Sequence, residues 1–192
     1  MDVPTLGYYR THDNVISPKM STAGSACYDL SAHLVVEDAN GRVKDYRDVT
    51  IFSPENEIST VTATCKIHPI EPGRFTPFRV VIPPRHRAII PTGIIFDIPE
   101  GHSVRLHPRS GLSIKKAFIV ANCEGVIDED YFHEIKSLMV NNSDVEIVVE
   151  HGDRIVQAEI AKTVQHYLVE TDVEPSQKTD RVGGLGSTGV KI

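Results

Sequence analysis

Residues 78–108 read FRVVIPPRHRAIIPTGIIFDIPEGHSVRLHP, and this stretch decides the fold class. Short runs of β-branched and other apolar residues alternate in it with proline and glycine, which are common turn residues. Several short strands with turn signals between them are typical of an all-β sandwich, jelly roll or barrel. The stretch therefore predicts an all-β domain.

The same pattern continues toward the C-terminus in four further runs: AFIVANCEGVI (117–127), EIKSLMVNN (134–142), VEIVVEHG (145–152) and RIVQAEIAKTVQHYLVET (154–171). No window repeats apolar residues at the helical period over three turns. One short helix is predicted at SGLSIKKA (110–117), with Ser110 as its candidate cap. A helix this short is expected to connect strands.

Composition narrows the class of protein. The 192 residues suit one domain, and 40% hydrophobic with 24% charged residues exclude a disordered chain and a membrane protein. The first residues lack a signal-peptide pattern, and three cysteines without a CxxC pair indicate a reducing compartment, so a cytoplasmic protein is expected. A formal net charge of −6 argues against a nucleic-acid-binding surface. Any polyanionic ligand must therefore meet a few placed cations.

Residues 35–75 and 174–192 differ from the strand-rich remainder. Within VVEDANGRVKDY (35–46), Asn40 and Gly41 predict a hairpin with a two-residue turn, and ISTVTATCKI (58–67) predicts an exposed strand. The C-terminal residues are polar and glycine-rich, which predicts a mobile tail. We therefore divide the chain into a β domain at 1–173, with an insertion at about 35–75, and a flexible tail at 174–192.

Two segments carry side chains suited to chemistry. Pro108 to Leu112 combine an arginine, a hydroxyl and backbone N–H groups at the start of the predicted helix, which suits a phosphate. A capped helix with a surface arginine is the alternative. NCEGVIDEDY (122–131) sets Asp128 and Asp130 at a predicted hairpin, where one carboxylate can act as an acid or base and Tyr131 offers a flat ring. An acidic turn is the alternative there.

Two further segments are a strand and the tail. In EHGDRIVQAEI (150–160), a buried Gln157 would need hydrogen-bond partners, although a solvent-facing polar row is the alternative. In RVGGLGSTGVK (181–191), the glycines begin like a P-loop, but Val190 stands where that motif has lysine. What remains is a run of backbone N–H groups and hydroxyls that can wrap a phosphate chain, or a solvated tail without function.

The order of these segments is more specific than any one of them. SACYDLSA (25–32), PRSGL (108–112), NCEGVIDEDY (122–131), GDRIVQ (152–157) and GGLGSTG (183–189) follow one another as five motifs do in the trimeric dUTPase family, which the chain therefore resembles. The resemblance implies a jelly-roll-like β-clip subunit and a homotrimer whose active sites are shared between subunits. It also implies hydrolysis of dUTP to dUMP and pyrophosphate with Mg²⁺.

The resemblance assigns roles residue by residue. Asp128 matches the carboxylate that activates the water attacking the α-phosphorus, and Asp29 and Gln157 match positions that hold the waters around substrate-bound magnesium. The other matched substrate contacts are Arg109, Ser110 and Gly111 for the phosphates, Asn122, Val126 and Ile127 for uracil, Tyr131 for the deoxyribose, Lys136 for the nucleotide, and Arg181, Leu185, Gly186, Ser187 and Thr188 for closure over the γ-phosphate.

Some positions depart from the family pattern. Cys27 stands where glycine is usual in the family. The substitution would be strained if the backbone there needs a positive φ. Leu185 replaces the usual aromatic residue of the tail, and Arg181 lies one residue nearer to Gly184 than is common. The stretch between the first two motifs is also longer than in compact members. We assign the excess to the insertion at about 35–75, either a surface arm that caps the trimer or binds a protein partner, or a tolerated loop.

Two other functions are carried as alternatives. A dCTP deaminase, or a bifunctional deaminase and diphosphatase, would share the fold but needs a glutamate in a TLE-like context, where this chain has Ser137, Leu138 and Met139. A non-catalytic trimeric regulatory module would keep the pocket and act through the insertion. Ammonia release from dCTP would identify the first, and binding that survives Asp128→Asn would identify the second. No nucleic-acid or membrane partner is expected.

Overall fold

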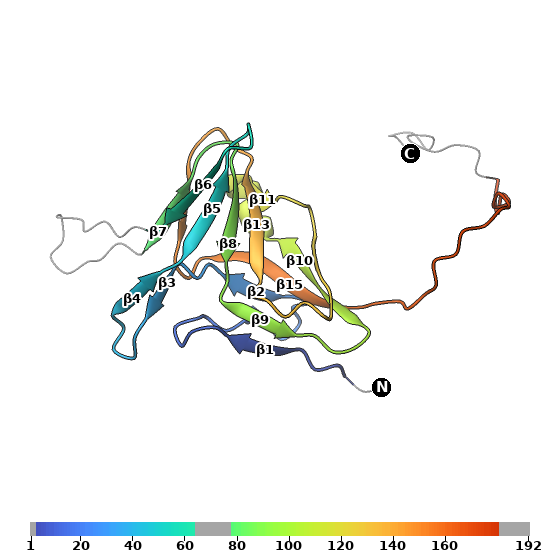
Figure 1. Ribbon diagram of the computed structural model, residues 1–192, viewed down its shortest axis with the longest axis horizontal. Helices are drawn as coiled ribbons and strands as arrows, with labels where there is room; N and C mark the ends of the chain where they lie inside the picture. Colours follow the sequence, from blue (N-terminus) through green and yellow to red (C-terminus); the bar gives the residue numbers. More distant parts are fainter. Residues whose placement is uncertain (1–2, 64–77, 181–192) are drawn as a thin grey trace.

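The computed structural model describes residues 3–63 and 78–180, and it confirms the predicted all-β class. Within that part of the chain the backbone forms fifteen β-strands and one short α-helix. Figure 1 shows the strands gathered into one body, from which residues 163–180 run away on one side. No helix in the described ranges is long and apolar enough to cross a membrane.

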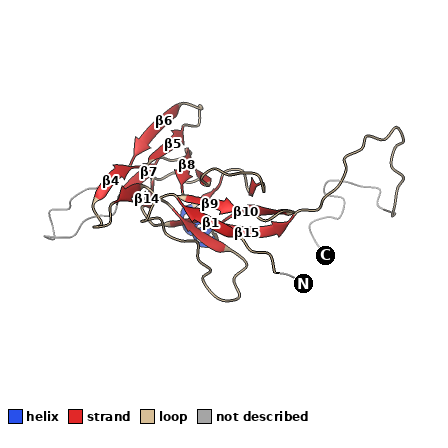
Figure 2. Ribbon diagram, turned by 60° about the horizontal axis from the view of Figure 1, so that its bottom comes forward, coloured by secondary structure: helices blue, strands red, loops and turns tan. Residues whose placement is uncertain are grey.

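Two larger antiparallel sheets form most of the body. The first sheet consists, in spatial order, of β12 (Gly125–Ile127), β10 (His102–Pro108), β15 (Arg154–Lys162) and β2 (Tyr28–Ser31). The second consists of β11 (Phe118–Val120), β13 (Lys136–Asn141), β8 (Arg87–Pro91), β5 (Asp48–Phe52) and β6 (Ile58–Thr62). In Figure 2, β5, β6 and β8 lie in a different part of the body from β10 and β15.

Three antiparallel pairs complete the described sheets. They are β1 (Gly7–Arg10) with β9 (Ile94–Asp97), β7 (Arg79–Ile82) with β14 (Ile147–Glu150), and β3 (Val35–Glu37) with β4 (Val43–Tyr46). The apolar runs read from the sequence correspond to β7 to β15. The expected strand after residue 154 ends at Lys162, earlier than the apolar pattern suggested.

The core forms where alternate side chains of these strands face inward, as the two-residue period of a pleated strand requires. On β10, Val104 and Leu106 are buried, whereas Arg105 and His107 lie partly exposed on the opposite face. The largest fully buried side chains are Phe118, Leu30, Leu34, Ile82, Ile90, Ile94, Ile135, Met139, Ile155, His33, Val35 and Val49.

The register of the first sheet lines up polar residues from distant parts of the chain. Asp29 on β2 lies opposite Gln157 on β15, which lies opposite His107 on β10. One step further along, Arg105 lies opposite Glu159. Because directly opposite residues project to the same side of a sheet, these five side chains share one face, which we call the polar face.

The predicted helix is present as α1 (Ser110–Lys116), but its cap differs from the prediction. Arg109 occupies the N-cap position, and no side chain there bonds to the helix backbone, so Ser110 is the first helical residue and not the cap. At the other end Ala117 adopts a left-handed φ of 50°, and its N–H donates to the Ser113 carbonyl at 3.1 Å. The chain then enters β11 directly.

The predicted hairpin at 35–46 forms, but its turn is longer than the two residues expected. Asp38 N–H donates to the Arg42 carbonyl at 2.8 Å, and Asp38 Oδ1 accepts from the N–H groups of Asn40 and Arg42. Gly41 has a φ of 73°, the left-handed conformation that commonly follows a tight turn in a three-residue hairpin loop. The aspartate carboxylate therefore sets the loop length, and Gly41 supplies the positive φ.

The insertion at about 35–75 is not uniformly exposed. β5 pairs with β8, and its Val49 and Ile51 are buried in the core. β6 is exposed along most of its length, as predicted for this strand, while the remainder of that run from residue 64 lies outside the described residues. The surface-arm interpretation can therefore apply only to β4, β6 and their loops, and the domain division itself stays a prediction.

Candidate active site

Asp29 joins three distant segments of the chain. Arg109 Nε donates to Asp29 Oδ1 at 2.8 Å, and Arg154 Nη1 donates to Asp29 Oδ2 at 2.8 Å. The Ser21 hydroxyl donates to the same Oδ2 at 3.1 Å. Only 9% of the Asp29 side chain is exposed, so both of its charge partners are needed to offset the cost of burying a carboxylate.

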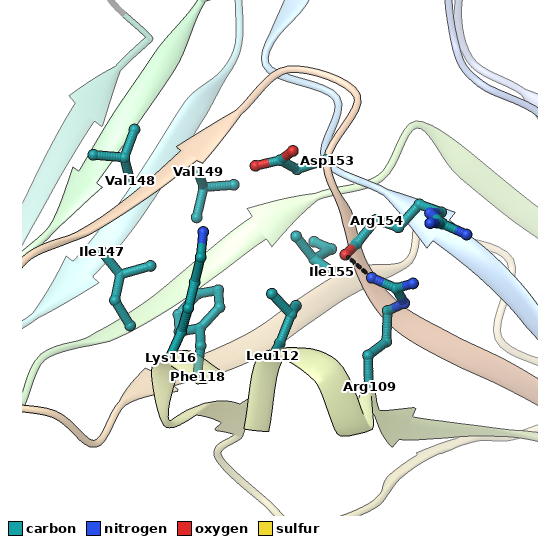
Figure 3. A pocket seen from close by; sticks show the side chains of 10 residues that line it. All are labelled: Arg109, Leu112, Lys116, Phe118, Ile147, Val148, Val149, Asp153, Arg154 and Ile155. Carbon is teal, nitrogen blue, oxygen red and sulfur yellow. Dashed lines mark hydrogen bonds between the residues drawn. The ribbon is translucent and has the colours of Figure 1, made fainter. Parts of the chain in front are cut away.

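Arg109 is fixed by a second contact. Its Nη1 donates to the Arg154 backbone carbonyl at 2.9 Å, the dashed line in Figure 3. A guanidinium has five N–H donors, and these two bonds occupy two of them. The group is therefore held in one orientation while donors remain for an anionic ligand. Ser110 and Gly111 follow directly in the first helical turn, where backbone N–H groups have no acceptor within the helix.

Gln157 has the hydrogen-bond partner that its position on the strand requires. Its Nε2 donates to the Pro108 carbonyl at 3.1 Å, directly before Arg109. Asp29 and Gln157 share the polar face, and Arg109 joins them through its bond to Asp29, although the sequence had assigned the three to separate motifs. Arg154, which lies in the fourth motif, joins the same group through its bond to Asp29.

A cavity beside this group is lined by cations over an apolar floor. Arg109, Arg154 and Lys116 contribute the positive charges, and Asp153 contributes one carboxylate. Figure 3 shows Arg109, just before α1, and Lys116, at the end of α1, pointing toward the strands across the cavity. The floor is made by Leu112, Phe118, Ile147, Val148, Val149 and Ile155. This is the local positive charge that an acidic chain would need to hold a polyanion.

Sequence reasoning did not identify Lys116 or Ser21 as part of this region. Lys116 reads as an ordinary basic residue in the last turn of a helix, and Ser21 lies in a loop without a motif. The sequence held a weak signal for Lys116 only, because a residue seven positions after Arg109 returns to the same helical face after two turns.

The base-recognition and catalytic candidates lie at the other end of β10. Val126 pairs with Arg105 and Ile127 with Val104, so Asp128 comes next to the start of β10, whereas Arg109 follows its end. Six residues of extended strand separate these ends by about 20 Å. Within one subunit, therefore, Asp128 and Arg109 do not meet.

The candidate residues near Asp128 in the sequence are exposed at the surface. The Tyr131 N–H donates to the Asp128 carbonyl at 3.1 Å, and the Tyr131 side chain is 39% exposed. Its hydroxyl donates to the Glu134 carbonyl at 3.4 Å. Asn122 is exposed in the turn before β12, and Lys136 is exposed at the start of β13. The tail candidates Arg181, Leu185, Gly186, Ser187 and Thr188 lie outside the described residues.

Cys27 does not strain the first motif. Among the described non-glycine residues, positive φ occurs at Asn56, Arg85, Ala117 and Cys123, and not at Cys27. Burial raises the pKa of the Cys27 thiol, and the carboxylates of Glu159 and Asp29 raise it further. The residue therefore stays a neutral thiol at physiological pH, and cysteine is tolerated at this position without a special backbone conformation.

No group of three or more His, Cys, Asp or Glu side chains in residues 3–63 and 78–180 is arranged to hold a metal ion. Asp29 can nevertheless contribute to one through water. Each of its oxygens accepts a bond from an arginine, yet a carboxylate oxygen has further lone-pair capacity. The donor set therefore fits a magnesium ion that is carried mainly by phosphates and touches the protein through water.

Comparisons with known proteins converge on one family. A model of the dUTPase family matches residues 76–189. The chain is 43% identical over 113 residues to the deoxyuridine 5'-triphosphate nucleotidohydrolase of Hydrogenobaculum sp. (strain Y04AAS1), a match that covers 58% of this chain and 77% of that protein. The family model begins at residue 76 and so does not include Asp29, which the contacts described above join to Arg109 and Arg154.

Solved structures show the same fold. The dUTPase of Staphylococcus bacteriophage 80alpha, solved with dUPNHPP, has a TM-score of 0.67 at 20% identity, covering 97% of this chain and 99% of that chain. A dUTPase mutant from phage phi11 of S. aureus, whose structure describes the coordination of a structural Mg(II) ion, has a TM-score of 0.59 at 19% identity, covering 90% of this chain and 99% of that chain. At these identities the likeness concerns the fold alone.

Proposed function

The chain belongs to the dUTPase family, and we propose that it hydrolyses dUTP to dUMP and pyrophosphate at a site whose phosphate end is organised by Asp29. The observation that carries this assignment is the double arginine contact of Asp29, because it joins the first, second and fourth family motifs in one group. Arg109, with Ser110 and Gly111, would contact the phosphates, and Arg154 would support Arg109. Phosphoryl transfer depends mainly on such positioning and charge stabilisation.

Asp128 is the proposed general base. It would accept a proton from the water that attacks the α-phosphorus, which requires a carboxylate within hydrogen-bond reach of that water. Tyr131 would lie against the deoxyribose, where a 2′-hydroxyl has no room. Asn122, Val126, Ile127 and Lys136 would surround the uracil. The exposure of Asn122, Val126, Tyr131 and Lys136 supports their availability to a substrate.

We infer that each active site combines two or more subunits of a homotrimer. The separation of Asp128 from Arg109 along β10 supports this inference, because one subunit cannot bring both to the same phosphorus. Closure over the γ-phosphate by Arg181, Leu185, Gly186, Ser187 and Thr188 is proposed from the sequence motif. The segment after β15 supports it, because residues 163–180 lead away from the body with exposed side chains such as Tyr167 and Leu168 (Figure 1).

Magnesium is the proposed cofactor. Asp29 and Gln157 would hold it through water while the triphosphate supplies the direct oxygen ligands. When bound, the ion would neutralise phosphate charge. The protein's own contribution is to present Arg109 and Arg154 to the remaining phosphate oxygens.

A protein partner for the insertion and a cytoplasmic location remain proposals. Tyr46 on β4 and Ile58 on β6 are 48% and 67% exposed, which supports a contact surface there. Because β5 is part of the core, deletion of the whole insertion would test stability and not binding. Substitution of Tyr46 and Ile58 by serine, followed by measurement of trimer mass and turnover, addresses the surface without removing core residues.

Pyrophosphate release from dUTP, dCTP, dTTP and UTP with magnesium, measured side by side, tests the function. We expect cleavage of dUTP and little of the other three. Asp128→Asn should lower kcat by roughly a hundredfold or more, as loss of a general base does. Ammonia release from dCTP would instead support the deaminase alternative, and no cleavage of any nucleotide would contradict the assignment.

A further inference from the structure

The segment that leads into β12 contains an unusually tight turn. The Glu124 N–H donates to the Asn122 carbonyl at 2.7 Å, across Cys123, whose φ is 64°. A turn closed between residues i and i+2 around a positive φ is rare and strained, and a residue with a side chain adopts it at a cost in free energy. Contacts outside the turn are therefore needed to keep it populated.

The Cys123 N–H donates to the Val120 carbonyl at 3.1 Å, and the Glu124 side chain adds contacts to a neighbouring strand. Its Oε2 accepts from Arg105 Nη1 at 3.3 Å, and its Oε1 lies 3.7 Å from His107 Nδ1. Both partners come from β10, the strand that pairs with β12 immediately after the turn. The carboxylate therefore ties the turn to the strand that fixes the position of Val126.

Arg105 and His107 also lie beside a carboxylate of the polar face. His107 Nε2 lies 3.0 Å from Glu159 Oε2 on β15, and Arg105 lies opposite Glu159 in the register of the sheet. Two basic side chains of β10 are thus flanked by a carboxylate from the turn and one from β15. We call these four residues, Arg105, His107, Glu124 and Glu159, the turn network.

We propose that the Arg105–Glu124 pair is a positioning device that fixes Asn122 and Val126 for recognition of the base and thereby sets selectivity for dUTP over dTTP. The proposal rests on the proposed function. Rejecting one extra methyl group requires a rigid pocket lining. A pocket whose lining can move gains or loses little binding energy per methyl group. The pair supplies that rigidity to the strained turn.

Glu124→Ala tests the proposal, with Asp144→Ala as the matched control. Asp144 is also a surface carboxylate paired with an arginine, Arg85, at 2.6 Å, but in the loop before β14. We expect Glu124→Ala to raise KM for dUTP about fivefold and to raise the dTTP-to-dUTP ratio of kcat/KM by a similar factor, the range of a partly exposed ion pair. kcat and the melting temperature should change little, and the control should change none of these quantities.

Rescue separates positioning from simple stability. Arg105→Lys keeps a cation beside Glu124 and should retain most of the selectivity, whereas Arg105→Met should behave like Glu124→Ala. Unchanged KM and selectivity in Glu124→Ala, in an otherwise active enzyme, would overturn the proposal. A fall in melting temperature with a matching fall in kcat and unchanged selectivity would do the same. If the unaltered protein does not cleave dUTP, it is the proposed function that fails.

Discussion

Asp29 carries one negative charge between two guanidinium groups, and the net charge of the cluster depends on all three side chains. Without the carboxylate, Arg109 and Arg154 would repel each other, and Arg109 would lose the contact that fixes its Nε. With the carboxylate in place, the pair presents a net positive charge from a site where the aspartate itself is almost buried. An acidic protein can hold a triphosphate in this way because what matters is charge within a few ångströms of the ligand.

His33 is a second residue whose charge state the fold dictates. Its side chain is buried, no hydrogen-bond partner is present for either ring nitrogen within the described residues, and its ring lies 5.3 Å from that of His12 and 5.4 Å from that of His151. Burial, with His151, Arg47 and His12 nearby, lowers the pKa of His33 to about 3. Burial also lowers the pKa of His151.

Stability should therefore fall as the pH drops from about 6.5 toward 3. The unfolded chain binds a proton at His33 near pH 6.5, whereas the folded chain does not until about pH 3, so acid favours unfolding throughout that window. At pH 5 the loss amounts to about 2 kcal/mol. Urea unfolding between pH 4 and 7.5 should show this slope, and His33→Leu should reduce it. The exposed His166→Leu serves as control, and an unaltered slope in His33→Leu would contradict the account.

At the scale of elements, the sequence was most informative where apolar residues alternate over whole strands. The runs at β7 to β15 could be found because their inward side chains share a two-residue period. β1 and β2 could not, since GYYR and YDLS are short and mix polar with apolar residues. The turn at Asp38 was misjudged because its length depends on a carboxylate bonding to the backbone.

For the active-site candidates too, the sequence was informative about single residues and not about the contacts between them. Motif order identified Asp29, Arg109 and Gln157 individually, but it could not reveal that Asp29 binds two arginines. Those contacts join residues 80 and 125 positions apart, and the pairing of β15 with both β2 and β10 brings them together. Lys116 was missed because its place in the cavity wall depends on the strands that face it in the fold.

The inserted strand β5 should be structural, whereas β6 beside it should be dispensable for stability. Ile51 on β5 is buried, so Ile51→Ala should lower the free energy of unfolding by about 2 to 5 kcal/mol, the range for a large-to-small change in a core. Ile58→Ala on β6, where the side chain is 67% exposed, should change it by less than about 0.5 kcal/mol. Chemical denaturation measures both. If both variants lowered the free energy of unfolding by the same small amount, β5 would not be part of the core.

At the scale of the whole molecule, the distance between Asp128 and Arg109 leads to a complementation test. Asp128→Asn and Arg109→Ala should each be inactive alone. If sites are shared between subunits, refolding an equal mixture should return active sites, about a quarter of the total for random assembly of a symmetric oligomer. Turnover of the mixture, compared with each variant refolded separately, measures this. A mixture as inactive as its components would place the complete site within one subunit.

The pairing of β2 with β15 also has a consequence for the order in which the molecule is made. A ribosome releases residue 29 long before residue 154, so β2 lacks its neighbouring strand β15 for most of synthesis. The nascent chain can build the β5 and β8 region first, since those strands are close in sequence. The ability to bind a triphosphate would then be among the last properties acquired, because a chain that ends before β15 lacks the strand that lies between β10 and β2.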